Sequence, residues 1–125
     1  MREILFRGKQ MYNGKWVEGF YVRIEQKYQS YFIFTSQLDI TKIWPGFVHY
    51  EVDPETIGQY TEMTDKNGKK IFEGDIVEID GKRYEVKCML GQFFIGINMP
   101  IAYKRFDCEV IGNIHDNPEL LQMEE

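Results

Sequence analysis

His115 and Asp116 are the adjacent residues whose types could best support catalysis, and they lie between Asn113 and Asn117. An imidazole beside a carboxylate can act as a general base. Adjacent residues on a strand, however, point to opposite faces of the sheet. We therefore favour a second interpretation, in which these residues form a polar loop and Asn117 caps a short C-terminal helix.

Glu73 and Asp75 flank Gly74 and are the second candidate for chemistry. Two carboxylates could bind a divalent cation or form an acid/base pair. A glycoside hydrolase needs its second carboxylate across a cleft, and a calcium loop needs more oxygen ligands at regular spacing. We favour a structural role, in which Gly74 takes a special backbone conformation and Asp75 accepts hydrogen bonds from nearby amides.

The remaining metal-ligating residue types are isolated. His49 has no partner at a useful spacing, and Cys88 and Cys108 form neither a CxxC motif nor a Cys/His pattern. Such a chain gives little support for zinc, and two separated cysteines are typical of reduced structural thiols. We predict no metal, no cofactor and no enzymatic activity.

Composition indicates one folded globular domain. The chain has 125 residues, of which 43% are hydrophobic and 19 are aromatic (9 Phe, 8 Tyr, 2 Trp), which is enough for one core. No apolar run approaches the roughly 18 residues of a membrane span, and the N-terminus lacks a signal-peptide pattern, so we expect a cytoplasmic protein with no membrane contact.

The net charge of −5 is unevenly distributed along the sequence. Residues 1–50 contain 7 Lys/Arg against 4 Asp/Glu, whereas residues 51–125 contain 8 against 16. A basic half beside an acidic half could attract a second copy head to tail. The alternative is that these charges form an ordinary solvated surface.

Three two-residue turn signals predict β-hairpins: Asn13-Gly14, Asn67-Gly68 and Asp80-Gly81. Asn-Gly and Asp-Gly tolerate the positive φ that type I′ turns require. Asp53-Pro54-Glu55 and Asn117-Pro118-Glu119 each predict the start of a short helix. Strand composition occurs in Ile4–Arg7, Trp16–Ile24, Tyr31–Thr35 (buried on both faces), Phe47–Val52, 71–86, Cys88–Leu90, Phe93–Ile97 and Glu109–Ile114.

Residues 36–46 receive no assignment, because the segment is polar and contains Trp44-Pro45-Gly46. Taken together, the pattern predicts an all-β, mainly β fold. We expect a small barrel or sandwich of seven to nine short antiparallel strands with one or two short helices. The chain 1–125 would be a single domain with two packed lobes, 1–52 and 60–125.

Three blocks carry a family resemblance: MREILFRGK with NGKWVEGFYV, then VDPETIGQYTEMTDKNGKKIFEGDIV, then VIGNIHDNPELL. With these blocks the chain resembles the YopX family of bacteriophage and prophage proteins. The resemblance implies a mainly β fold, a phage or prophage gene setting and hence a bacterial host cytoplasm. It implies no function, because the function of that family is unknown.

One residue departs from the pattern that the resemblance leads us to expect. Glu62 follows Tyr60-Thr61 where a glycine is expected. If that glycine normally supplies a positive φ, the loop in this protein should be shaped differently. Any ligand contact shared at the loop would then be in doubt.

The resemblance, the charge asymmetry and the absence of a catalytic set lead to a non-enzymatic, protein-binding scaffold. Its partner would be a second copy, giving a homo-oligomer, or a host or phage protein. The loop residues predicted to make contacts are Tyr60, Asp65, Lys66 and Asn67.

The alternative is an SH3-like or OB-like module that binds nucleic acid. The segment Ile71–Val86 resembles the opening hairpin of small SH3-like barrels, and aromatic residues beside cations can stack bases and bind phosphates. The residues that would make these contacts are Arg23, Lys27, Tyr28 and Tyr31. The acidic net charge is unfavourable for this alternative.

Overall fold

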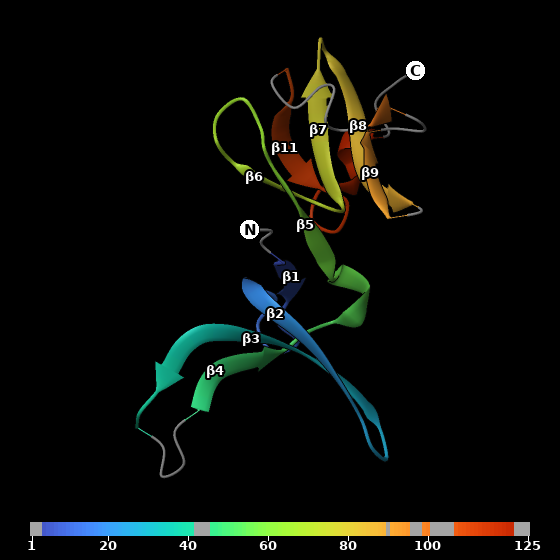
Figure 1. Cartoon of the computed structure of the whole chain (residues 1–125). Coiled ribbons are helices and arrows are strands. Elements are labelled where there is room, and N and C mark those ends of the chain that lie inside the picture. The colour runs from blue at the N-terminus through green and yellow to red at the C-terminus, as the bar shows by residue number, and fades with distance from the viewer. Residues whose placement is uncertain (1–3, 42–45, 90, 96–98, 101–106, 122–125) are drawn as a thin grey trace. The chain divides into compact units, whose positions relative to one another are not determined.

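The fold is mainly β (Figure 1). The structure is a computed structural model that describes residues 4–41, 46–89, 91–95, 99–100 and 107–121. Within these ranges the chain forms eleven strands and two short 3-10 helices. The strands pair only in antiparallel fashion, so the predicted all-β class is confirmed.

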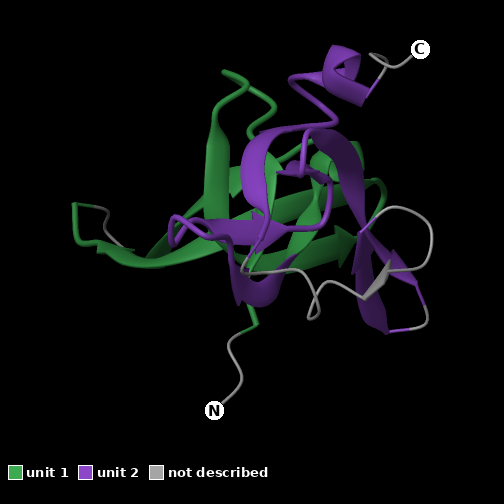
Figure 2. Cartoon of the chain, turned by 90° about the horizontal axis from the view of Figure 1, so that it is seen from above, with its two compact units in different colours: residues 1, 3–59 green, residues 2, 60–125 purple. Residues whose placement is uncertain are grey.

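The chain divides into two compact units, which Figure 2 shows in different colours. The first unit ends at Gln59 and the second begins at Tyr60. The division falls inside one strand, β5 (Gly58–Thr64): Gly58 and Gln59 pair with β1, whereas Tyr60 and Thr64 pair with β6.

The first unit contributes four antiparallel strands, β4-β3-β2-β1, to a six-stranded sheet in the order β4-β3-β2-β1-β5-β6. The chain returns to β1 after β4, because Gln10 and Val52 form a β-bridge and the Asp53 amide donates to the Lys9 carbonyl at 2.9 Å. The residues after β4 are thereby hydrogen-bonded to the end of β1. The elements are β1 (Phe6–Lys9), β2 (Trp16–Glu25), β3 (Gln29–Asp39), β4 (Gly46–Glu51) and the 3-10 helix η1 (Pro54–Thr56).

The core of the first unit is small and depends on glycine. Ile33 and Val52 are the fully buried side chains of this unit among the described residues, and a Cβ on Gly8 would lie 3.1 Å from Val52 Cβ. A Cβ on Gly19 would collide with the backbone oxygen of Phe34. Both glycines therefore allow strands to approach where larger residues would separate them.

The burial predicted for Tyr31–Thr35 was wrong, because Ile33 alone in that run is buried. One face of β3 is open, and the other covers the core. The strand also continues to Asp39, through residues that had no assignment, after a register shift between Phe34 and Leu38. Trp44 and Pro45 lie outside the described residues.

The second unit contains a five-stranded sheet in the order β10-β9-β8-β7-β11. The main hydrophobic core cluster of this unit consists of Ile71, Val77, Ile79, Val86, Ile95, Cys108 and Val110, and most of these residues come from predicted strands. The elements are β6 (Lys70–Phe72), β7 (Asp75–Ile79), β8 (Lys82–Met89), β9 (Gln92–Ile95), β10 (Met99–Pro100), β11 (Glu109–Asn113) and the 3-10 helix η3 (Pro118–Leu121).

Of the three predicted type I′ turns, one is present. Asp80 (φ 52) and Gly81 (φ 81) connect the paired residues Ile79 and Lys82. At the other two sites only the glycine has a positive φ, and the loops are longer. The reason is local hydrogen bonding: the Lys15 amide donates to Asn13 Oδ1 at 2.9 Å, and Asp65 organises the other loop.

The predicted helix starts are found as 3-10 turns. Asp53 caps η1, and its carboxylate accepts from the Glu55 amide at 3.0 Å. The expected capping role of the Asn117 side chain was wrong, because its Oδ1 accepts from the Asn113 amide at 3.3 Å. The Asn117 backbone oxygen accepts from the Leu120 amide instead, at 3.0 Å.

Candidate functional site

The predicted contact loop presents only part of its residues to solvent. Tyr60 and Asp65 are buried, with 7% and 6% of their surface exposed. The Tyr60 ring packs on Phe72 at a centroid distance of 5.5 Å. In this structure the side chains of Tyr60 and Asp65 stabilise the loop from inside.

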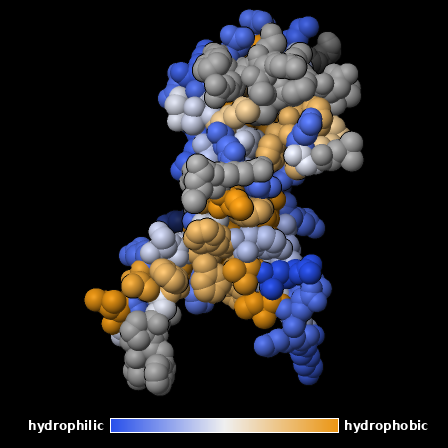
Figure 3. All heavy atoms as spheres, viewed as in Figure 1, coloured by the Kyte–Doolittle hydropathy of each residue, from blue (hydrophilic) through white to orange (hydrophobic). Residues whose placement is uncertain are grey.

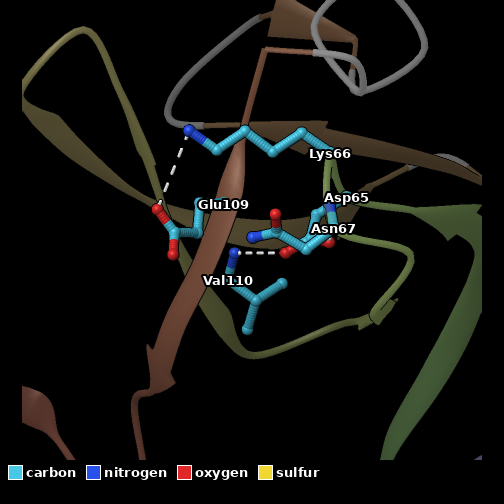
Figure 4. A network of polar contacts seen from close by, with 5 residues as sticks. All are labelled: Asp65, Lys66, Asn67, Glu109 and Val110. Atoms are coloured by element: carbon cyan, nitrogen blue, oxygen red, sulfur yellow. Dashed lines mark hydrogen bonds and ion pairs between the residues drawn. The ribbon is translucent and has the colours of Figure 1, made fainter.

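Asp65 joins its own loop to β11 (Figure 4). Its Oδ1 accepts from the amides of Asn67 and Lys69 at 2.8 and 2.9 Å, and its Oδ2 accepts from the Val110 amide at 2.8 Å. Burial alone would raise the pKa of this carboxyl, but these three amides and the Lys69 charge outweigh it, so the pKa is lowered. The carboxylate is ionised and fully engaged at neutral pH.

Of the four predicted contact residues, Lys66 and Asn67 are exposed. The Lys66 amide donates to the Cys108 carbonyl at 3.0 Å, which fixes the backbone. Its ammonium lies 3.8 Å from Glu109 Oε1, and both side chains are about half exposed, at 51% and 43% (Figure 4). A partner could reach these two side chains, so their role in binding stays a prediction.

The four residues of the nucleic-acid alternative lie together on the β2–β3 hairpin. Arg23 is directly opposite Tyr31 in the register, while Lys27 and Tyr28 form its tip. Lys27 lies 5.8 Å from the Tyr28 ring centroid, and Tyr28 is 75% exposed. Arg23 already forms an ion pair with Glu25 at 2.6 Å, and the Glu25 charge weakens the attraction of this site for a phosphate.

The two candidate catalytic clusters have structural hydrogen bonds. Asn113 Oδ1 accepts from the amides of His115 and Asp116 at 3.0 and 2.9 Å, as in a polar turn. Asp75 is 1% exposed and accepts from the Phe72 amide at 2.7 Å, next to Gly74 at φ 94. Within the described part of the chain, no three His, Cys, Asp or Glu side chains could hold a metal ion.

The feature that sequence reasoning missed is an exposed apolar surface on the first unit. Because paired residues point to the same side of a sheet, the pairs Phe20/Phe34 and Val22/Phe32 share one face, opposite the buried Ile33. We call this surface the apolar face. It consists of Phe20, Val22, Ile24, Phe32, Phe34, Leu38, Phe47 and His49, with the carboxylate of Glu51 beside Phe32 at its margin.

Large parts of the apolar face are open to solvent. Phe20, Leu38 and Phe47 are 59%, 55% and 51% exposed, and Figure 3 shows apolar side chains at the surface of this unit. His49 stacks on Phe34 at a centroid distance of 4.4 Å and an interplanar angle of 12°. The apolar residues at even positions of β2 were visible in the sequence, but alternation alone does not tell whether a face is covered.

Comparison with known proteins identifies the family of this chain. The family model described as YopX protein matches residues 5–122. The chain belongs to the YopX family. The YopX fold also resembles the crystal structure of protein EF1440 from Enterococcus faecalis, with 25% sequence identity, a TM-score of 0.66, and coverage of 97% of this chain and 99% of that chain.

No curated protein matches this YopX chain. In the part of the chain that the structure describes, no helix is long and apolar enough to cross a membrane. Glu62, where the YopX resemblance predicts glycine, has φ 71 within an irregular stretch of β5. Glu62 thus adopts the left-handed conformation that favours glycine, so the absence of glycine does not by itself require a different backbone shape here.

Proposed function

We propose that this chain is a non-enzymatic accessory protein of phage and prophage genomes that binds a protein partner in the bacterial host cytoplasm. The apolar face is the observation that carries the proposal. Exposed apolar patches of this kind on a folded protein are typical of interaction surfaces. The partner is a second copy, which would make a homo-oligomer, or a host or phage protein.

The size of the apolar face supports binding. At about 200 Å² for a large apolar side chain, the exposed fractions of its most open residues amount to roughly 450 Å². The residues counted are Phe20, Val22, Ile24, Leu38 and Phe47. A stable interface buries about 800 Å² per partner, so this face would supply about half of one side and surrounding polar residues the rest.

A charge placed on the apolar face tests this proposal. Phe20→Lys and Phe47→Lys should weaken self-association in sedimentation equilibrium, and should reduce retention of a partner from a bacterial host lysate treated with nuclease. Met89→Lys is the matched control, because Met89 is 43% exposed in the second unit. If self-association and partner retention of all three variants equalled those of the wild type, the proposal would be contradicted.

Lys66 and Asn67 are a secondary contact in the same proposal, because both side chains are exposed on a loop that Asp65 holds in place. Asn67→Ala leaves the Asp65 hydrogen bonds intact, since they use the Asn67 backbone amide. A reduced partner affinity in this variant would support the contact, whereas unchanged affinity would remove the loop from the binding surface.

Nucleic-acid binding by the β2–β3 hairpin is the second candidate function. The observation that favours it is the placement of Arg23, Lys27, Tyr28 and Tyr31 on one hairpin. Binding of a fluorescent single-stranded oligonucleotide should then weaken steeply with salt, because counterions are released. Lys27→Ala should reduce the affinity and the salt slope, and Lys82→Ala is the control. A flat salt response would count against this function.

A further inference from the structure

A groove lies beside the open edge of β4 in the first unit. It has a volume of about 510 Å³ and is lined by the loop Gln10–Asn13 and by His49–Glu51 at the end of β4. The two walls are joined by a hydrogen bond of 2.9 Å from the Met11 amide to the Glu51 carbonyl. The groove therefore has a hydrogen-bonded base, and its size suits a short peptide or a few side chains.

The backbone at the edge of this groove is suited to pairing with another strand. Val52 donates to the Tyr31 carbonyl at 2.9 Å. Because hydrogen-bonded pairs alternate along an antiparallel ladder, His49 and Glu51 direct their N–H and C=O groups away from β3. Met11 uses the Glu51 carbonyl, and in the described sheet β4 has no strand neighbour other than β3. The backbone of His49 therefore faces outward where the Met11 pairing ends.

The chemistry of the groove favours a cation. Glu51 lines the groove, and its carboxylate, on the face of β4 opposite Tyr50, forms no ion pair with any described residue. None of the lining residues is Lys or Arg. Tyr12 and Tyr50 line the same groove and are 97% and 37% exposed. Aromatic faces attract ammonium and guanidinium groups, and a carboxylate forms charge-assisted hydrogen bonds with them.

We propose that this groove binds an extended, basic segment of the partner protein as an additional strand along β4, with a Lys or Arg side chain against Glu51. Main-chain hydrogen bonds to His49 would give affinity, and the Glu51 carboxylate would give specificity, as in other cases of strand addition. This inference rests on the proposed protein-binding function and names the chemistry of the segment that is recognised.

A positional-scanning library of ten-residue peptides, measured by fluorescence anisotropy against the full chain, tests the charge preference. Lys or Arg should be selected over Glu at one position by about tenfold, which corresponds to one charge-assisted hydrogen bond. Glu51→Gln should remove this preference. Glu55→Gln is the matched control, because Glu55 is exposed in the same unit but does not line the groove.

Backbone methylation of the selected peptide tests strand pairing. N-methyl groups on the alternate amides that face β4 should abolish binding, whereas methyl groups on the other amides should leave it unchanged. Equal effects of the two sets, no selection of Lys or Arg, or a preference that persists in Glu51→Gln would overturn the proposal.

The same library separates failure of the groove from failure of the protein-binding function. Selection of apolar peptides whose binding is lost in Phe20→Lys but kept in Glu51→Gln would overturn the groove proposal and support binding at the apolar face. If Phe20→Lys and Phe47→Lys also retain normal self-association and partner capture, the protein-binding function at the apolar face fails as well.

Discussion

Glu62 has a backbone conformation that glycine adopts more easily. Its φ of 71 places it in the left-handed region, which costs a non-glycine residue about 1 kcal/mol or somewhat more. Glu62→Gly should therefore raise the free energy of unfolding by about 0.5–1 kcal/mol, after allowing for the extra entropy of glycine in the unfolded chain. Urea denaturation of the variant and the wild type measures the change.

Glu85 provides the matched control for this substitution. It lies in β8 with ordinary strand backbone and is paired with Ile76. Glu85→Gly should lower the free energy of unfolding by about 0.5–1 kcal/mol, because glycine weakens a strand interior. The same chemical change should thus have opposite signs at the two positions, and a loss of stability at both would contradict the backbone argument.

Asp65 should make stability dependent on pH in the acid range. Its carboxyl has a lowered pKa in the folded chain, so its contribution is complete above the unfolded pKa of about 3.9 and is lost as the pH falls through the folded value. Asp65→Asn should cost about 1–3 kcal/mol at pH 7, because the new amide group faces backbone donors.

The pH dependence of stability distinguishes an ionised Asp65 carboxylate from a side chain that contributes only by packing. Urea midpoints of wild type and Asp65→Asn should differ by a constant amount from pH 7 down to about pH 4 and should converge as the pH falls further, through the lowered folded pKa. Asp53→Asn is a control, since Asn can also cap η1 through its side-chain oxygen. A constant difference between Asp65→Asn and wild type from pH 7 to pH 2 would disprove the ionic role.

At the scale of elements, the turn and cap signals that the structure confirms depend on local residues. Asp80-Gly81 and Asp53-Pro54 adopt the expected turn and helix start. Asn67-Gly68 did not form a type I′ turn, because Asp65, two residues earlier, bonds to the Asn67 amide and to β11. The bond to Val110 spans 45 residues, and no local pattern can reveal it.

The extent of β3 and its open face could not be predicted for a related reason. Strand pairing depends on distant partners, and the polar residues after Phe34 belong to β3 because β4 pairs with Leu38 and Asp39. An aromatic run such as Tyr31–Thr35 suggests burial on both faces. Whether each face is covered depends on how many layers pack on the sheet, and the composition of one strand does not contain this information.

Gly19 allows β2 and β3 to approach closely, and its replacement tests the packing of these elements. A Cβ there would collide with the Phe34 backbone oxygen and would lie 3.0 Å from Ile33 Cγ2. Because backbone cannot move aside as a side chain can, Gly19→Ala should cost about 1–3 kcal/mol. Thermal or urea unfolding measures the loss.

Gly46 is the control at the start of β4, because a Cβ built there meets no atom within 4 Å. Gly46→Ala should change the free energy of unfolding by less than about 0.5 kcal/mol. If both substitutions had the same effect, the close approach of β2 and β3 at Gly19 would have no energetic importance.

At the scale of the whole molecule, the basic N-terminal half disappears when net charge is counted by structural unit and not by sequence half. The first unit, residues 1 and 3–59, contains 6 Lys/Arg and 7 Asp/Glu, a net charge of −1, whereas the second unit, residues 2 and 60–125, contains 9 and 13, a net charge of −4. The first unit therefore offers no net positive charge to attract the acidic unit of a second copy. Association through the apolar face becomes the better explanation for a homo-oligomer.

Salt separates these two modes of association. Raising the salt from about 0.1 M to about 1 M shortens the Debye length from about 10 Å to about 3 Å, which should weaken head-to-tail attraction several-fold. An apolar contact should keep its association constant within about twofold or strengthen, because salt also screens the repulsion between copies of net charge −5. Sedimentation equilibrium at the two salt concentrations measures the association constant.

A contact made by the apolar face must depend on Phe20 and not on screened charge. A wild-type association constant that falls steeply with salt, together with normal association of the Phe20→Lys variant, would therefore support the electrostatic mode instead.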